Sequence, residues 1–397
     1  MQVLVRPEQS ASLETRQLTN LSKPSTDVWQ RLQAGLEQWF QATSAFLNCL
    51  ASGRRIPTEI ERLLSPHQQQ QLHEWRRRYC LHSHRPLTWA WPAAVDVQLH
   101  VDGSLQIMDC DFSVPSGLDR LCSSGIHSTS ETRALILNQL FGCGQNSWSG
   151  RRAVLLDPDS TGTSRRSNEF LSWLLDVPLV TATELAIDRN ELQLQTGRSH
   201  QPVDVIIRRV DDDLLDPNCG RPDSLTGVPG IVRHWQEGKV SILNPPGTGL
   251  LRHRSMLSLI PECIRIFHAQ QPLLDLVPTL SLERAEVRAG VFRDADHYAI
   301  RPDDPLHPAR PWFGGSTDSG SLDVLRQRVE MSPARWVARP LQLENSGRTS
   351  LRLFGTLQHS FRLLPAALMR PCEPDGGAAT LINSDTRMAV VWQESGL

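Results

Sequence analysis

The chain has 397 residues, of which 39% are hydrophobic and 21% are charged, which is typical of a folded globular protein. At roughly 150 residues per domain, this length predicts two or three domains. Lysine plus arginine (41) nearly balances aspartate plus glutamate (43), so no general basic field would attract nucleic acid or a membrane. No apolar run approaches the roughly 20 residues of a membrane helix, and the N-terminus lacks the apolar stretch of a secretory signal. We therefore expect a cytoplasmic protein.

The first third of the chain predicts helices around a hairpin. Residues 27–50 repeat apolar side chains at helical spacing, and residues 65–79 form a more polar helical pattern. Over 95–112 the period changes to two, and the pair Asp102–Gly103 predicts a tight turn between two strands. A further helix is expected over 130–141.

The middle of the chain predicts a doubly wound unit. Strands at 151–158, 179–180 and 203–208, with a helix at 168–175, follow the order of a parallel sheet covered by helices. Ligands bind beyond the carboxyl ends of such strands, which predicts a crevice near Asp211. After residue 298 short strands recur, as in an α+β ending, and the Pro-, Gly- and Ser-rich stretch 303–320 is expected to be a long loop.

Charged residues are densest in the segment RRVDDDLLDP (208–217), at the end of one of these strands. Arg208 and Arg209 could grip a carboxylate or phosphate through bidentate bonds. An amine or a cation could be held by the four aspartates Asp211, Asp212, Asp213 and Asp216. On residue types alone, the favoured alternative is a solvated acidic turn that pairs with its own arginines.

Two aspartates, Asp109 and Asp111, alternate on a predicted strand and would project from one face. Paired carboxylate oxygens suit Mg²⁺ that bridges nucleotide phosphates. An edge strand with two solvated aspartates is an equally good interpretation.

Two further patterns suggest anion binding. The loop Gly247–Thr248–Gly249, followed by Arg252, His253 and Arg254, could present backbone N–H groups to an anion, although it lacks the Lys-Ser/Thr of a P-loop and an ordinary turn is favoured. Arginines also recur near the C-terminal strands, where they could stabilise phosphoryl transfer or simply pair with surface acids: Arg301, Arg339, Arg348, Arg352 and Arg370.

Over residues 203–278 the sequence resembles the circularly permuted type 2 ATP-grasp proteins, which include glutathionylspermidine-synthase-like ligases. That family carries Arg-Arg-x-Asp-Asp with Leu-Asp-Pro, then Ser-x-x-Gly-Val-Pro-Gly, then Asn-x-x-Gly-Thr-Gly, matched here at 208–217, 224–230 and 244–249. An Asp-Gly hairpin leading to Pro-Ser-Gly (115–117), and Leu351-Arg352 near the end, extend the resemblance to most of the chain.

The resemblance implies an α/β (α+β) fold, a circularly permuted ATP-grasp with a Rossmann-like pre-ATP-grasp unit. Residues 1–150 would hold N-terminal helices and the permuted ATP-grasp segment with the metal-ligand strand. Residues 151–235 would be the Rossmann-like unit, and residues 236–397 the remaining ATP-grasp subdomains.

The resemblance also implies an ATP- and Mg²⁺-dependent carboxylate–amine ligase for an amino acid or peptide-like substrate, in which ATP phosphorylates a carboxylate and an amine displaces the phosphate. Asp109 and Asp111 would bind the metal. Arg301, Arg339 and Asn383 would bind ATP, and Arg352 and Arg370 would be catalytic. The substrate would be bound by Ser116, Gly117, Arg208, Arg209, Asp211, Asp212, Asp216, Gly247, Thr248 and Gly249.

Departures from the family pattern gather on the nucleotide side. Asp109-x-Asp111 stands for Glu-x-Asn, Arg301 for a lysine before proline, and Ser350 for the aspartate of Asp-Leu-Arg. The glycine-rich phosphate loop is not recognisable, because residues 303–312 carry prolines instead. The alternative is therefore a catalytically inactive homologue that binds a peptide-like ligand or a partner ligase.

Overall fold

The computed structural model describes residues 26–81, 87–100, 103–123, 151–158, 162–314, 319–341, 349–358, 360–370 and 388–391. The helix expected over 130–141, Asp102, Arg348 and Asn383 lie outside these ranges.

The predicted N-terminal helices are present as α1 (Thr26–Ala51) and α3 (Pro66–Tyr79), with the short α2 (Thr58–Glu61) between them. A capping box starts α3, because Ser65 Oγ accepts from the Gln68 backbone while the Gln68 side chain accepts from the Ser65 backbone. The apolar stripe of α1 is buried, and Phe40 packs its ring against Phe112 at 5.0 Å between centroids.

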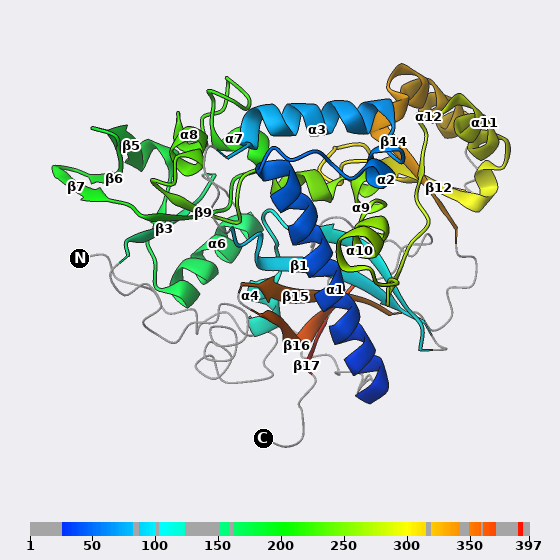
Figure 1. The fold of residues 1–397 in the computed structure, drawn as a ribbon, viewed down its shortest axis with the longest axis horizontal. Helices are drawn as coiled ribbons and strands as arrows, with labels where there is room; N and C mark the ends of the chain where they lie inside the picture. The colour runs from blue at the N-terminus through cyan, green and yellow to red at the C-terminus, as the bar shows by residue number, and fades with distance from the viewer. Residues whose placement is uncertain are drawn as a thin grey trace.

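Strands from both ends of the chain form one central sheet, over which α1 runs (Figure 1). The predicted hairpin is β1 (Ala90–Leu99) and β2 (Leu105–Asp111), and β1 pairs on its other side with β15 (Thr349–Leu357). The order is β10-β2-β1-β15-β16-β17, completed by β10 (Asp275–Leu276), β16 (Phe361–Arg370) and β17 (Met388–Val391). Segments far apart in sequence thus share a sheet.

The two faces of the central sheet differ in chemistry. Val95, Val97 and Ile107 belong to the core cluster that includes α1. On the opposite face Asp109 is paired in register with Asp96, which is paired in turn with Arg352. Asp111 lies two residues further along, so Asp109 and Asp111 share a face as predicted.

The predicted doubly wound unit is confirmed as a parallel sheet of order β4-β3-β8-β9, seen on the left of Figure 1. Its strands are β3 (Ala153–Leu156), β4 (Leu179–Val180), β8 (Val205–Arg208) and β9 (Ser241–Leu243). Helix α6 (Gly162–Leu175) connects β3 to β4, and α4 (Leu118–Ser123) packs against α6. A small sheet is added by β5 (Leu185–Asp188), β6 (Glu191–Thr196) and β7 (Ser199–Pro202).

A third sheet of order β11-β14-β12-β13 lies on the right of Figure 1 with α11 (Ala285–Arg293) and α12 (Ser319–Met331). Its strands are β11 (Leu280–Ser281), β12 (Tyr298–Pro302), β13 (Trp312–Phe313) and β14 (Trp336–Pro340). The expectation of an unbroken loop over 303–320 was wrong, because Trp312 and Phe313 pair with β12 and α12 begins at Ser319.

Short elements complete the described part: α7 (Asp212–Leu215), α8 (Ile231–Gln236), α9 (Arg254–Leu257), α10 (Ile260–His268) and the 3-10 helices η1 (Ala182–Glu184), η2 (Thr248–Arg252), η3 (Ala295–His297) and η4 (Pro333–Arg335). Among the described helices none is both long and apolar enough to cross a membrane. The domain boundaries proposed from the sequence remain predictions.

Candidate functional site

Arg208 ends β8 and is almost fully buried, with 1% of its surface exposed. It donates to the backbone oxygens of Asn244 (2.7 Å) and Pro245 (3.1 Å) and to Thr248 Oγ1 (2.8 Å). It also forms an ion pair of 2.8 Å with Asp212. These contacts hold the 244–249 loop against the end of the strand.

The carboxylate of Asp212 binds the backbone of the glycine loop. Asp212 accepts from the backbone N–H groups of Gly247 (3.0 Å) and Gly249 (2.8 Å), one with each carboxylate oxygen. Gly247 has a φ of +93°, and a Cβ there would lie 2.4 Å from Trp75 Nε1, so only glycine fits. The backbone donors that the sequence offers to a ligand are therefore already bound to Asp212.

Asp216 also holds the backbone, and its exposed fraction is 1%. Its Oδ1 accepts from the N–H groups of Asn218 and Gly230, each at 2.9 Å, and its Oδ2 accepts from Val232 N at 3.0 Å. The carboxylate thus satisfies donors at the start of α8.

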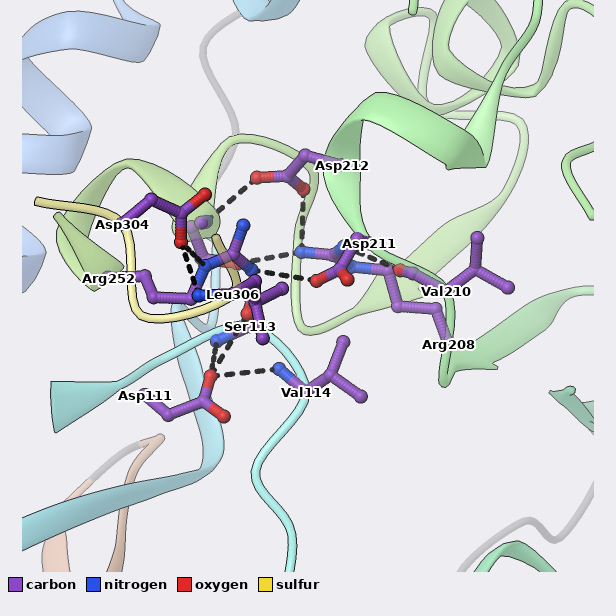
Figure 2. A network of polar contacts seen from close by, with 12 residues as sticks. Asp111, Ser113, Val114, Arg208, Val210, Asp211, Asp212, Arg252, Asp304 and Leu306 are labelled. Atoms are coloured by element: carbon purple, nitrogen blue, oxygen red, sulfur yellow. Dashed lines mark hydrogen bonds and ion pairs between the residues drawn. The ribbon is translucent and has the colours of Figure 1, made fainter. Parts of the chain in front are cut away.

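Beside this loop, three carboxylates surround Arg252 (Figure 2). Its Nη1 donates to Asp211 at 2.7 Å and its Nε donates to Asp304 at 3.0 Å. Burial lowers the pKa of Arg252, but Asp211, Asp304 and Asp111 outweigh it and raise that pKa above its ordinary value. Burial also raises the pKa of the Asp211 carboxyl, against the opposite effect of Arg252.

Asp111 shapes the turn after β2. Its Oδ1 accepts from Ser113 N (2.9 Å), Ser113 Oγ (3.0 Å) and Val114 N (3.1 Å). Figure 2 shows this turn facing Arg252 and Asp211. The predicted metal ligand is thus brought next to part of the predicted substrate-binding set.

Two arginines fix the 113–117 segment from different elements. Arg209 donates to Pro115 O and to Asn168 Oδ1, both at 2.8 Å. Arg352 donates to Ser116 O at 3.3 Å and forms two 2.8 Å bonds with Asp96. A cavity of about 20 Å³ lies here, at the ends of β8 and β9. It has room for about one water molecule.

Asp109 stands in a different environment, among buried arginines. Its Oδ1 accepts from Arg254 Nε and Arg339 Nη2, both at 3.1 Å, and Arg301 acts on it electrostatically. Arg254 also donates to Pro302 O at 2.8 Å. The ATP-binding predictions Arg301 and Arg339 thus lie with Asp109. From the sequence, Arg254 was expected only to help bind an anion as part of the basic run 252–254, and its contact with Asp109 was not predicted.

This arrangement predicts a specific acid sensitivity. Burial would raise the pKa of the Asp109 carboxyl, but Arg254, Arg339 and Arg301 lower it from its ordinary value of 3.8. The unfolded chain therefore takes up this proton before the native protein does, so the stabilisation is present above about pH 4 and is lost as the pH falls further. In urea unfolding at a series of pH values, Asp109→Asn should show a shallower acid decline than the native chain. The exposed Asp188→Asn should not, and equal slopes for both variants would contradict this assignment.

Unsatisfied polar atoms lie along the same face of the central sheet. Gln98 and Ser350 are fully buried and paired in register, and Gln98 Nε2, Gln98 Oε1 and Ser350 Oγ have no hydrogen-bond partner among the described residues. Arg370 pairs with Ser350 in the ladder, but its side chain lies outside the described part. Buried polar groups of this kind need a partner such as water or a polar ligand.

Comparison with protein families decides the identity of this fold. The model of circularly permuted ATP-grasp type 2 matches residues 25–371. The chain belongs to this family. The arginine cluster around Asp109 joins the central sheet to the β11–β14 sheet.

Curated relatives are distant. An uncharacterized protein of Synechocystis sp. is 25% identical over 335 residues, which cover 79% of this chain and 68% of the relative. An uncharacterized protein of Mycobacterium tuberculosis is 24% identical over 358 residues, covering 84% and 62%. A Frankia alni protein, named provisionally as a glutamate–cysteine ligase, is 25% identical over 320 residues, covering 74% and 37%. The chain thus spans about two thirds or less of each relative's length.

The site fits the nucleotide of an ATP-grasp protein better than it fits the metal. Arg254, Arg301 and Arg339 are buried and suit phosphate oxygens, and Arg339 Nη1 is buried without a hydrogen-bond partner in the described part. Asp109 and Asp111, however, each have a carboxylate oxygen already bonded to two or more donors. No group of three or more His, Cys, Asp or Glu side chains that could hold a metal occurs among the described residues. The donor set does not fit Mg²⁺ as it stands.

Proposed function

We propose that this chain is an ATP-dependent carboxylate–amine ligase that acts on an amino acid or a peptide-like substrate. The observation that carries the proposal is the separation of charge along β2, with positive surroundings at Asp109 and mixed surroundings at Asp111. Asp109 lies among three arginines, whereas Asp111 lies beside Arg252 and its carboxylates. A ligase needs such a polarity, because its phosphate donor is an anion and its amine arrives as a cation.

The residues around the two aspartates have distinct roles in this proposal. On one side, Arg254, Arg301 and Arg339 hold the phosphates of ATP, which supplies the phosphoryl group that activates the carboxylate. On the other side, Asp211 and Asp304 attract the amine.

Arg209 is the best placed residue to orient the substrate carboxylate. Its hydrogen bonds go to the neutral oxygens of Asn168 and Pro115, so no acid forms an ion pair with it within the described contacts. By contrast, Arg208 and Asp216 are fully bonded to the protein and position the loop rather than the ligand.

Trapping with hydroxylamine tests the proposal without knowledge of the natural amine. The protein is incubated with ATP, Mg²⁺, hydroxylamine and each protein amino acid in turn, and the hydroxamate is measured. An activated carboxylate reacts with hydroxylamine, so we expect hydroxamate with at least one amino acid or with glutathione as a peptide-like probe. ATP binding without any hydroxamate would contradict ligase activity.

Asp211→Asn tests the side assigned to the amine. Once an active amine is found, the variant should raise its KM by roughly tenfold, because an interaction with a charged partner is lost, while hydroxamate formation stays close to that of the native chain. The exposed Asp223→Asn, from the same segment, is the control and should change neither value. An equal loss of both activities would place Asp211 in the structure of the loop instead.

A second candidate is a binding protein that does not turn over ATP. It is favoured by the bonded state of Asp109 and Asp111 and by Ser350, which stands where the family pattern has an aspartate. Hydroxamate formation above that of an Arg254→Gln variant would exclude this candidate.

A further inference from the structure

We propose that this site binds nucleotide phosphates without a divalent cation, because Arg254, Arg301 and Arg339 supply the positive charge and Asp109 is their internal counter-ion. The inference rests on the proposed function only in taking a nucleotide as the ligand. In this inference Asp109 neutralises part of the charge of the arginines and does not bind a metal.

The three arginines converge from separate elements. Arg301 comes from β12 and Arg339 from β14 of the third sheet, and both are 1% exposed. Arg254 starts α9 and is 2% exposed. They meet at Asp109 on the central sheet, with 3.1 Å from its Oδ1 to both Arg254 and Arg339. Two sheets are therefore joined through one carboxylate.

The guanidinium groups of this cluster repel one another. Burial, together with the like charges of Arg301 and Arg339, lowers the pKa of Arg254 to about 10 despite the opposing effect of Asp109. Asp303 also acts on Arg254, but its oxygens are taken by Ser255 and by His253. An anion that reaches these mutually repelling guanidinium groups would therefore be stabilised.

Arg339 carries a buried donor atom without a hydrogen-bond partner among the described residues. Arg339 donates through Nε to Thr279 Oγ1 at 3.1 Å and through Nη2 to Met108 O at 2.9 Å. Its Nη1 is buried with no hydrogen-bond partner in the described ranges. A guanidinium held on two sides with one free donor is preorganised to receive a phosphate oxygen.

The same geometry opposes a cation at Asp109. A divalent ion on Oδ1 would have to displace two guanidinium groups and would lie near a third, at a cost that carboxylate–metal bonds would have to offset. A phosphate oxygen, in contrast, replaces the carboxylate as acceptor for the same donors. The sign of the effect of Asp109→Asn on anion binding therefore separates the two roles.

Calorimetry provides the test. Sodium tripolyphosphate and ATP are titrated separately into the full chain, first in EDTA and then in excess Mg²⁺. We expect both to bind in EDTA, and Mg²⁺ not to tighten the binding. Asp109→Asn should tighten binding in EDTA severalfold, because the internal anion that competes for the arginines is gone.

Arg339→Gln should weaken tripolyphosphate binding in EDTA by about ten- to a hundredfold, the loss of a charge-assisted bond. Arg328→Gln is the matched control, because it removes one positive charge from an exposed position on α12 of the same sheet unit, and it should leave binding unchanged. Thermal melting of each variant, with and without tripolyphosphate, checks that the chain is folded and reports binding by a second route.

The outcomes separate this inference from the proposed function. Binding that requires Mg²⁺ and is weakened by Asp109→Asn overturns the inference and leaves the ligase proposal intact. Metal-free binding without hydroxamate formation supports the inference and overturns the ligase proposal. Absence of binding of both probes under both conditions overturns both.

Discussion

Arg208→Met should lower the free energy of unfolding by about 3–5 kcal/mol, the usual cost of removing one partner of a buried ion pair. The change leaves Asp212, with 13% of its side chain exposed, without its guanidinium partner. It also leaves the backbone oxygens of Asn244 and Pro245 without their donor. Methionine keeps most of the buried volume, so the loss reports the polar contacts and not a cavity. Urea unfolding at neutral pH measures it.

The control for this change is Arg221→Met. Arg221 pairs with Asp223 at 2.7 Å, but 61% of its side chain is exposed, so its loss should change the free energy of unfolding far less than the loss of Arg208. If Arg208→Met is as stable as Arg221→Met but loses substrate binding, Arg208 is a ligand residue, as the sequence suggested, and not the anchor of the loop.

Asp216→Asn should cost about 3 kcal/mol of unfolding free energy, because an amide cannot accept on both sides from the three backbone N–H groups that the carboxylate binds. The amide NH₂ would face either Val232 N or the pair formed by Asn218 N and Gly230 N. Buried donors without an acceptor are costly, so the start of α8 should loosen first. Hydrogen exchange of the α8 amides, together with urea unfolding, measures the effect.

Asp213→Asn is the matched control, because Asp213 lies on α7, which ends just before Asp216. Asp213 pairs with Arg78 at 2.7 Å, but 67% of its side chain is exposed, so a change below about 1 kcal/mol is expected. If both variants lose the same stability, the burial of Asp216 does not determine its contribution.

Much of the architecture follows from local pattern. Helical spacing identified α1, and period two with a Gly103 turn identified the β1–β2 hairpin, because these periods record which side of an element is buried. The order of strands and helices from 151 onwards identified the parallel sheet. The prediction of a long loop over 303–320 failed, because β13 has only two residues and is too short to show a period.

The sequence by itself determined the family and showed which segments are rich in charged residues. The RRVDDDLLDP segment carried the family pattern and the densest charge. Most of these charges bind groups of the protein itself: Arg208 and Asp212 hold the glycine loop, and Asp216 holds the start of α8. Residue types alone could not distinguish an arginine that binds a ligand from one that holds a loop in place, because both roles need the same positive charge.

Only the tertiary structure decided which charges meet. The bond from Arg254 to Asp109 spans 145 residues, that from Arg339 to Asp109 spans 230, and that from Arg352 to Asp96 spans 256. A period of two tells that Asp109 and Asp111 share a face, but it carries no information about which surface packs against that face. Since the charge around a carboxylate depends on that packing, the fold places Asp109 among arginines and Asp111 beside Arg252 and the acids that bind it.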